Sequence, residues 1–335
     1  MTSAPTEELV RMLRSARRLV ITSHTSPDGD AIGTELGLAR LLSRHGKQVQ
    51  VWNRDPTPAI FSALDGADAI HVGGSPALDL DLDEVDAVVF LECPTLDRCG
   101  LERELGALPG INLDHHLGNS GYGVVNWVDT AAPAVGEMVF RLAEAMELDV
   151  DPITADLLLM ALFADTGSFR FSNATPEAFE SAARMIRAGG SPERAARVLF
   201  DQRPLAALRL LAEITASLEL AADGTVATAL LTPDMSARAG AGRGDSEGMI
   251  DHLRSLDGVQ AVALLRVLDD GRVKVSLRSR GAIDVEQVAR RHGGGGHRSA
   301  AGCTVDGAIE DVRRRFVGDL VEAVQPVVTS SEATP

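Results

Sequence analysis

The sequence predicts an α/β protein of two domains, an N-terminal domain built on a parallel β-sheet and a smaller C-terminal α/β domain. Three observations lead to this expectation. The chain has 335 residues, and a domain usually takes about 100–200 residues. Short apolar runs alternate with helical segments in the first half, which is typical of βαβ units in a parallel sheet. After a helical stretch punctuated by glycine and proline, the alternation begins again.

The N-terminal half contains the apolar runs expected for the parallel sheet. Residues 18–23 (RLVITS), with the apolar core LVI, lead into the polar turn SPDGD, and the apolar residues that follow recur at helical spacing. This pattern predicts a buried strand followed by a helix. Further strands and one strongly apolar helix are expected in the same half. The strands are residues 48–52, 85–91 and 111–113, and the helix is residues 152–164.

A helical connection is predicted between the two domains. Its glycines and prolines separate short amphipathic helices, and a strand pattern resumes after it. The helices expected in and before this connection are residues 176–189, 192–201 and 204–220. The elements expected after it are strand 225–231, helix 245–256 and a hairpin of residues 259–268 and 272–277. The predicted boundaries are 1–190 for the first domain, 191–220 for the helical linker, 221–328 for the second domain and 329–335 for a disordered tail.

The composition is that of a globular protein without a membrane anchor. Hydrophobic residues make up 45% and charged residues 24%, so an ordinary core is expected. No signal-peptide pattern opens the chain, and no apolar run approaches the ~20 residues that span a bilayer. Three cysteines at irregular spacing argue against a disulfide framework and against a structural zinc site. We therefore expect a cytoplasmic protein with reduced thiols and no membrane partner.

The net charge limits the partners. The formal charge of −16 would repel a long polyanion, because proteins that grip long nucleic acids neutralise many phosphates with lysine and arginine. Phosphates are therefore expected to bind singly or in small numbers, in a local pocket where a metal ion or an arginine reverses the sign. This expectation excludes long duplex nucleic acid as a substrate.

Carboxylates and imidazoles follow several of the apolar elements. Because ligand sites in open α/β sheets lie beyond the carboxyl ends of the strands, these residues are expected to converge on one rim. Each segment alone has an ordinary explanation, such as a turn in which Asp30 caps a helix. Their joint occurrence favours a site that holds a cation. The residues are His24, Asp28, Asp30, Glu92, Asp114, His115, His116 and Asp165.

These motifs resemble the DHH phosphoesterase superfamily, specifically its nanoRNase and pAp-phosphatase branch. The resemblance covers residues from about 15 to 325. The glycine-rich motif near the C-terminus is the most specific of the set and is similar to the signature of the family's substrate-binding domain. The matching segments are His24-x3-Asp28-Gly29-Asp30, Glu92 to Gly100, Asp114-His115-His116, Asp165-Thr166-Gly167, and Gly293 to His297 followed by Ala300-Ala301-Gly302.

The resemblance implies two divalent ions. His24 and Asp28 would hold the first ion, and Asp30, His115 and Asp165 the second, with the carboxylate at position 92 bridging both. Asp114 would orient the neighbouring ligands, and His116 would face the substrate phosphate. Such mixed carboxylate and imidazole ligands suit manganese, with iron, cobalt and magnesium as alternatives.

One residue departs from the family pattern. The family usually has aspartate where this chain has Glu92, and the extra methylene moves the carboxylate outward. Either the strand end shifts to compensate, or the metal spacing and preference change. Asp97 lies five residues further on and could in principle replace Glu92 as the ligand, but the family pattern assigns Asp97 to a different position. Activity is still expected, and Cys93, beside Pro94, has the pattern of a packed thiol rather than a nucleophile.

The C-terminal glycines have two interpretations. Four consecutive glycines can form a flexible linker, or they can let a backbone approach a phosphate and present N–H groups to it. The second interpretation assigns Gly294, Gly295, Gly296 and His297 to substrate binding. Arg278 in the segment VSLRSR is the best arginine for a phosphate contact, and Arg280 is a weaker one. Arg98 is the weakest of the three, with bracing of its own loop as the alternative role.

The function expected from the resemblance is hydrolysis of oligonucleotides of about two to five units to mononucleotides, with removal of the 3′-phosphate of pAp as a second activity. The alternatives are a cyclic-dinucleotide phosphodiesterase and a regulatory protein that binds nucleotides with catalysis impaired by Glu92. A manganese pyrophosphatase is disfavoured because that group lacks the GGGGH segment, and a RecJ-type exonuclease is disfavoured by length and charge. The oligomeric state is left open, with a homodimer among the choices.

Overall fold

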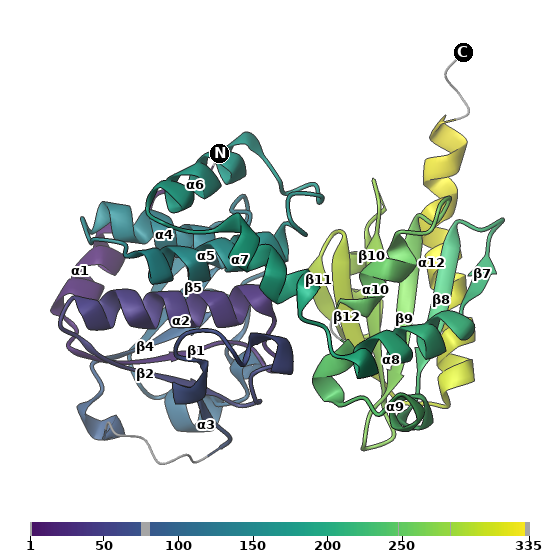
Figure 1. Cartoon of the computed structure of the whole chain (residues 1–335), viewed down its shortest axis with the longest axis horizontal. Coiled ribbons are helices and arrows are strands. Elements are labelled where there is room, and N and C mark those ends of the chain that lie inside the picture. The colour runs from purple at the N-terminus through teal and green to yellow at the C-terminus, as the bar shows by residue number, and fades with distance from the viewer. Residues whose placement is uncertain (1, 75–80, 247, 282, 332–335) are drawn as a thin grey trace. The chain divides into compact units, whose positions relative to one another are not determined.

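The computed structural model describes residues 2–74, 81–246, 248–281 and 283–331. The chain divides into two compact units, residues 1–202 and residues 203–335, each with its own sheet (Figure 1). Both units mix strands and helices, so the predicted α/β class with a parallel N-terminal sheet and a second, smaller sheet domain is confirmed.

The first unit is built on a parallel sheet. The strands are ordered β3-β2-β1-β4-β5-β6, and every neighbouring pair is parallel. The order reverses direction between β1 and β4, which is the place where open α/β sheets bind ligands. Its strands are β1 Arg18–Thr22, β2 Gln48–Asn53, β3 His71–Val72, β4 Ala87–Leu91, β5 Gly110–Asp114 and β6 Val125–Val128. Its helices are α1 Glu7–Ser15, α2 Gly29–Arg44, α3 Glu102–Leu105, α4 Val135–Ala145, α5 Pro152–Asp165, α6 Pro176–Arg187 and α7 Pro192–Ala196.

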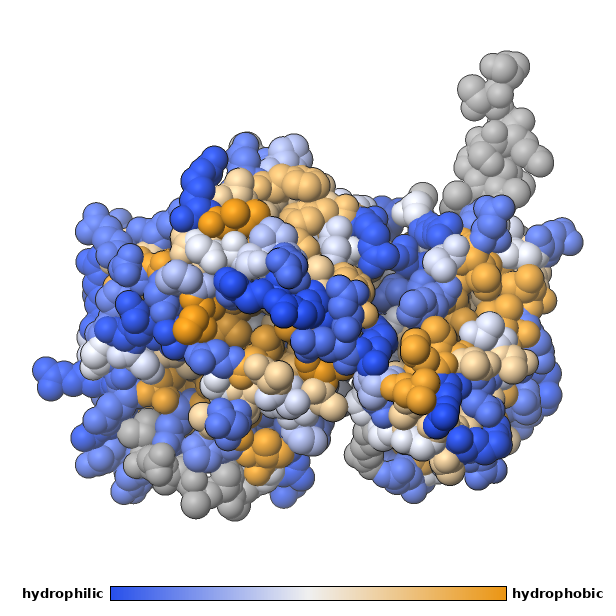
Figure 2. Space-filling view, viewed as in Figure 1, coloured by the Kyte–Doolittle hydropathy of each residue, from blue (hydrophilic) through white to orange (hydrophobic). Residues whose placement is uncertain are grey.

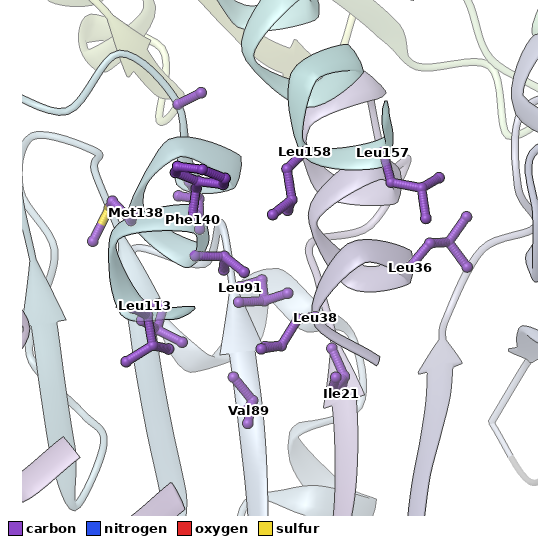
Figure 3. Close-up of a cluster of buried hydrophobic side chains, with 14 of the residues drawn as sticks. Ile21, Leu36, Leu38, Val89, Leu91, Leu113, Met138, Phe140, Leu157 and Leu158 are labelled. Atoms are coloured by element: carbon purple, nitrogen blue, oxygen red, sulfur yellow. The ribbon is translucent and has the colours of Figure 1, made fainter. Parts of the chain in front are cut away.

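The central strands are buried on both faces, which explains why they are continuous apolar runs in the sequence. Alternate side chains of β1 and β4 enter two different clusters, because successive residues of a strand point to opposite faces. Figure 3 shows the larger cluster, in which Ile21, Val89 and Leu91 lie beneath side chains of α2, α4 and α5. Val88 and Phe90 point to the opposite face, into a smaller cluster next to α3.

Three glycines let α2 pack closely on α5. Gly29, Gly33 and Gly37 are spaced four apart, so they lie on one face of α2. A Cβ atom at Gly29 would lie 2.6 Å from Ala164 Cβ, and one at Gly37 would lie 2.6 Å from Leu158 Cδ2. The two helices are therefore antiparallel and in backbone contact. This packing places the N-terminus of α2 beside the C-terminus of α5, where two of the predicted metal ligands lie.

Gly33→Ala is expected to destabilise the protein by about 1–3 kcal/mol, as overpacked cores do. A Cβ there would lie 2.7 Å from the backbone oxygen of Leu157, which has no rotamer through which to retreat. The matched control is Gly318→Ala in a C-terminal helix, where a new Cβ meets nothing within 4 Å. That change is expected to stabilise the protein by up to ~1 kcal/mol. Urea unfolding of both variants checks the pair, and equal stabilities would contradict the packing argument.

The second unit has a mixed sheet ordered β11-β12-β10-β9-β8-β7. β8 and β9 are parallel, and the other neighbouring pairs are antiparallel. Its strands are β7 Glu219–Ala221, β8 Val226–Leu231, β9 Ala261–Val267, β10 Val273–Ser279, β11 Gly295–His297 and β12 Ala300–Val305, and its helices are α8 Leu205–Ala216, α9 Pro233–Ala239, α10 Met249–Arg254, α11 Val285–Arg291 and α12 Ile309–Ser331.

Several expected elements differ from the structure. The predicted helical linker 191–220 is divided: α7 and a π-helical turn, Arg197–Asp201, belong to the first unit, and α8 belongs to the second. Helix 204–220 ends at Ala216 because strand β7 begins at Glu219 and pairs with β8. The predicted helix 245–256 is shorter, at Met249–Arg254. Residues 329–331 of the predicted tail are helical, and residues 332–335 lie outside the described residues.

Hydrophilic side chains cover much of the face shown in Figure 2, with apolar patches between them. The exposed large apolar residues include Phe179, at 53% exposure, and Phe200, at 43%. Within the described part of the chain, no helix combines the length and hydrophobicity needed to span a bilayer.

Candidate metal centre

The loop after β1 carries the first group of predicted ligands. His24 Nδ1–H donates to the backbone oxygen of Thr25 over 2.9 Å, which directs Nε2 toward Asp28, whose Oδ2 lies 3.9 Å away. Burial lowers the pKa of His24 against the opposing effect of the Asp28 carboxylate. Asp28 caps α2 by accepting from Ala31 N over 3.0 Å. A neutral imidazole and a carboxylate therefore face one another at the strand end.

Asp30 lies in the first turn of α2 and is almost completely buried. Its carboxylate accepts from Thr34 Oγ1 at 2.9 Å, from Val135 N at 2.7 Å and from Gly136 N at 2.9 Å. The two backbone donors belong to the N-terminus of α4, where the helix dipole favours negative charge. Burial, followed by the nearby Asp165 carboxylate, nevertheless raises the pKa of Asp30 to about 6.

Glu92 directly follows β4 and adopts a left-handed backbone conformation, with φ of +58°. Such a conformation is rare for residues other than glycine and clusters at functional sites. The side chain is 3% exposed, with Oε1 at 3.5 Å from His115 Nε2 and Oε2 at 3.8 Å from His116 Nδ1. Burial raises the pKa of Glu92 well above its usual range. The turned backbone thus directs this longer carboxylate inward, toward both imidazoles.

The Asp114-His115-His116 segment ends β5. Asp114 is fully buried, and its Oδ1 accepts from His115 N at 2.8 Å and from His116 Nδ1 at 2.8 Å. Although burial opposes it, the hydrogen bond with His116 lowers the pKa of Asp114 to about 2. Asp114 is therefore a carboxylate whose oxygens are occupied by protein donors, and it holds the two histidines in place.

His115 faces the carboxylates. Its Nδ1–H donates to the backbone oxygen of Ala132 over 3.0 Å, so Nε2 points toward Glu92 and toward Asp165, whose Oδ2 lies 3.7 Å away. Burial opposes the effect, but the carboxylates of Glu92 and Asp165 raise the pKa of His115 well above its ordinary value. His24 and His115 thus have the same arrangement, in which a backbone carbonyl fixes the tautomer and frees Nε2 for a ligand role.

Three asparagines of the site were missed in the sequence. Asn119 Nδ2 donates to Asp114 Oδ2 at 2.6 Å and to Asn112 Oδ1 at 2.8 Å. Asn173 Nδ2 donates to the backbone oxygens of Pro133 and Asp165, at 3.0 and 3.1 Å. Asn119 follows the Asp-His-His segment by three residues, and this short spacing is the signal that could have found it. Asn173 carries no comparable signal, because it lies in a loop among polar residues.

The donor set fits a divalent cation. One ligand atom from each of Asp30, Glu92 and His115 lies within 4.8 Å of the other two, and all three side chains are buried. Glu92 Oε1 is buried without a hydrogen bond of normal geometry. Clustered carboxylates that raise one another's pKa are stabilised by a cation among them. Cys93 is fully buried, and burial raises the pKa of its thiol, as in a packed thiol rather than a nucleophile.

The glycine-rich segment of the second unit belongs to a sheet. Residues Gly295–His297 form β11, which pairs with β12, so the segment is not a flexible linker. A Cβ at Gly294 would lie 2.1 Å from the backbone oxygen of Gly302, and Gly296 has a φ of +140°. His297 is half-buried on this strand, and Arg278 lies on β10. Only glycine fits at both positions, because β11 lies directly against the backbone of β12, whereas a Cβ at Gly295 would meet nothing within 4 Å.

Two family models match the chain. Residues 18–164 match the N-terminal domain of the DHH family, and residues 223–325 match the DHHA1 domain. Among curated proteins, the bifunctional oligoribonuclease and PAP phosphatase NrnA of Thermus thermophilus is 33% identical over 296 residues, 86% of this chain and 84% of that protein. NrnA of Bacillus subtilis is 24% identical, over 89% of this chain and 92% of that protein.

Two further matches differ in how much of the other protein they cover. The cyclic-di-AMP phosphodiesterase PdeA of Listeria monocytogenes is 23% identical over 88% of this chain, which spans only 46% of that protein. Among solved structures, an exopolyphosphatase-related protein from Bacteroides fragilis matches with a TM-score of 0.84 and 25% identity, over 96% of this chain and 97% of that chain. The matched domains, the similarity along most of the chain and the clustered motifs lead to one conclusion. The chain belongs to the DHH family and is a hydrolase of phosphate esters.

Proposed function

We propose that this protein hydrolyses very short oligonucleotides, dinucleotides above all, to mononucleotides, and that it also removes the 3′-phosphate of pAp. The observation that carries the proposal is the buried group of Asp30, Glu92 and His115, with ligand atoms within 4.8 Å of one another at the switch point of the sheet. The similarity to the Thermus enzyme along 84% of its length supports the substrate class. The acidic charge of −16 supports short substrates over long ones.

Two divalent ions are part of the proposal, with manganese as the metal that best suits the mixed carboxylate and imidazole ligands. His24 and Asp28 would hold the first ion, Asp30, His115 and Asp165 would hold the second, and Glu92 would contribute a carboxylate to both. When bound, such a pair supplies a water of lowered pKa and neutralises charge at phosphorus. We also propose a cytoplasmic location, which cell fractionation tests, and a homodimer, which light scattering tests.

The protein's own residues do the positioning. The backbone carbonyls of Thr25 and Ala132 fix the tautomers of His24 and His115. Asp114 holds Nδ1 of His116, which orients the opposite ring nitrogen for contact with a phosphate oxygen. Phosphoryl transfer depends mainly on positioning and charge neutralisation. Asp114 and His116 can therefore contribute to catalysis without holding a metal ion themselves.

The second unit is proposed to bind substrate through Gly294, Gly295, Gly296, His297 and Arg278. We expect His297→Ala to raise KM for a dinucleotide roughly tenfold with little change in kcat, because it removes binding that is uniform in ground and transition states. The control is His252→Ala, an exposed histidine on α10 of the same unit. A fall in kcat at constant KM would contradict the binding role.

A substrate panel tests the proposed function. Linear dinucleotides, pAp, cyclic di-AMP and pyrophosphate are offered separately with manganese, and mononucleotide and phosphate release are measured. Release of mononucleotides from the linear dinucleotide, with slower or no cleavage of the cyclic one, is expected. Preferred cleavage of cyclic di-AMP would favour the activity named for PdeA, and release only from pyrophosphate would overturn the substrate class. Nucleotide binding without turnover would make this chain an impaired member of the family.

A further inference from the structure

A buried polar cluster lies next to the loop that carries His24, and the proposed catalytic mechanism gives it no role. It consists of Glu35 on α2, Asn53 at the end of β2 and Ser23 after β1, which are 0%, 1% and 1% exposed. On α2, Glu35 stands one residue before Leu36, whose side chain Figure 3 shows in the apolar cluster. A carboxyl group in such surroundings is unfavourable unless its hydrogen bonds compensate for the loss of water.

Hydrogen bonds connect this carboxyl group to the loop that carries His24. Asn53 Nδ2 donates to Glu35 Oε2 over 2.8 Å, and Ser23 N donates to Asn53 Oδ1 over 3.3 Å. Ser23 is the residue directly before His24. Asn53 therefore bridges Glu35 and the end of β1, with one amide group serving both.

The same loop is held at two further points. Ser26 N donates to Asp55 Oδ2 over 2.8 Å, and Thr25 N donates to the backbone oxygen of Arg98 over 2.8 Å. Asp55 follows β2, as Asn53 ends it. The loop from β1 to α2 is thus anchored mainly to the end of β2, and Glu35 is the anchor that comes from the helix.

The carboxyl group has polar neighbours but no countercharge in the part of the chain that the structure describes. Glu35 Oε1 and Ser23 Oγ are both buried without a hydrogen bond of normal geometry, and no ion pair joins Glu35 to a lysine or arginine within the described residues. Burial raises the pKa of Glu35 to about 7, against hydrogen bonds from the side chains of Asn53 and Ser23. The polar contacts of Glu35 go to the end of β2 and to the residue before His24, so its carboxyl group links α2 to the loop that carries a proposed ligand.

We propose that Glu35 is a positioning residue that, through Asn53 and the backbone of Ser23, ties the helix carrying Asp30 to the strand end carrying His24. Because His24 and Asp30 belong to different halves of the proposed ligand set, this link sets the separation between the halves. Residues that only orient metal ligands commonly change metal affinity or activity 10–100-fold when lost, as an order of magnitude. The inference rests on the proposed metal centre.

The test measures manganese binding to metal-depleted protein by calorimetry, together with kcat and KM. Glu35→Leu is expected to weaken manganese binding by roughly 10–100-fold and to raise the manganese concentration needed for half-maximal kcat by the same factor. Glu35→Gln keeps an oxygen that accepts from Asn53, so it is expected to bind manganese within about threefold of the native protein. Rescue by this variant separates positioning from mere filling of space.

The matched control is Glu137→Leu. Glu137 is another buried acid of the first unit, 2% exposed, and its carboxylate accepts from Ser181 Oγ and Arg141 Nε, both at 2.9 Å. Its loss is expected to lower Tm without changing manganese affinity. If Glu35→Leu does not fold, Asn53→Ala removes the same link and is expected to weaken binding in the same direction.

The outcomes separate the two proposals. A native protein that binds no manganese would overturn the metal centre itself. A native protein that binds manganese, together with folded Glu35→Leu or Asn53→Ala variants that bind it equally well, would overturn the positioning role alone. Weaker binding in these variants with rescue in Glu35→Gln supports it.

Discussion

Replacing His115 with alanine is expected to reduce dinucleotide hydrolysis by more than about a hundredfold, which is the upper range for residues that merely support a metal ligand. His115 Nε2 lies 3.5 Å from Glu92 and 3.7 Å from Asp165, so its loss leaves two carboxylates without the imidazole between them. The fold should persist, because the change removes the side-chain hydrogen bond from Nδ1 to the backbone oxygen of Ala132 and keeps the backbone hydrogen bond from His115 N to Asp114. Initial rates, metal content and circular dichroism on the same preparation measure all three effects.

The control for this change is His45→Ala. His45 caps the C-terminus of α2, at the end of the helix away from Asp30, and its Nδ1 also bonds a backbone oxygen, that of Leu41. It should leave the turnover rate and metal content unchanged. Retention of more than about a tenth of native activity by His115→Ala would show that the imidazole is not a ligand.

Replacing Glu92 with glycine is expected to abolish turnover and yet to stabilise the metal-free protein. An L-residue pays about 1–2 kcal/mol for the left-handed conformation that Glu92 adopts at φ +58°, and glycine does not. Against this gain, glycine lowers the stability by roughly 0.5–1 kcal/mol, because it loses more conformational entropy on folding. Removal of a buried carboxyl group raises the stability. We expect a net gain of roughly 1 kcal/mol by urea unfolding in chelator.

Glu147→Gly is the matched control for this pair of effects. Glu147 is also a glutamate at φ +58°, but it is exposed in the turn after α4. Its replacement should relieve the same backbone strain without any loss of activity. The difference between the two variants isolates the contribution of the buried carboxylate. Full activity in Glu92→Gly, or a metal-free protein less stable than the native one, would contradict the assigned role.

Most of the candidate site could be predicted because its residues follow apolar elements. β4 and β5 are buried on both faces, so their ends are visible as the point where an apolar run meets Glu92 or Asp114. Asp165 ends α5, whose apolar residues stop at the same place. The parallel order of the strands then brings these residues to one rim, as the pattern predicted.

The remaining features depend on tertiary contacts that leave little trace in the sequence. β3 has two residues and β6 has four, which are too short for a two-residue period to stand out. The π-helical turn Arg197–Asp201 has an ordinary helical sequence. Glu35 reads as a polar residue on an amphipathic helix, and only the structure shows that it is buried against Asn53.

The left-handed conformation of Glu92 was equally hidden. The sequence identified the departure from aspartate and left open how the longer side chain is accommodated. In the structure the backbone turns at this residue, and the side chain reaches both His115 and His116 while remaining buried. The turned backbone thus accommodates the longer carboxylate inside the site, and retained activity stays a prediction.

The most direct measurement is anomalous diffraction from crystals grown with manganese, recorded together with dinucleotide turnover before and after chelation. Two manganese peaks per chain are predicted, one beside His24 and Asp28 and one beside Asp30, His115 and Asp165, with Glu92 in contact with both. Turnover should vanish on chelation and return with manganese. Peaks elsewhere, or hydrolysis that persists in chelator, would contradict the account.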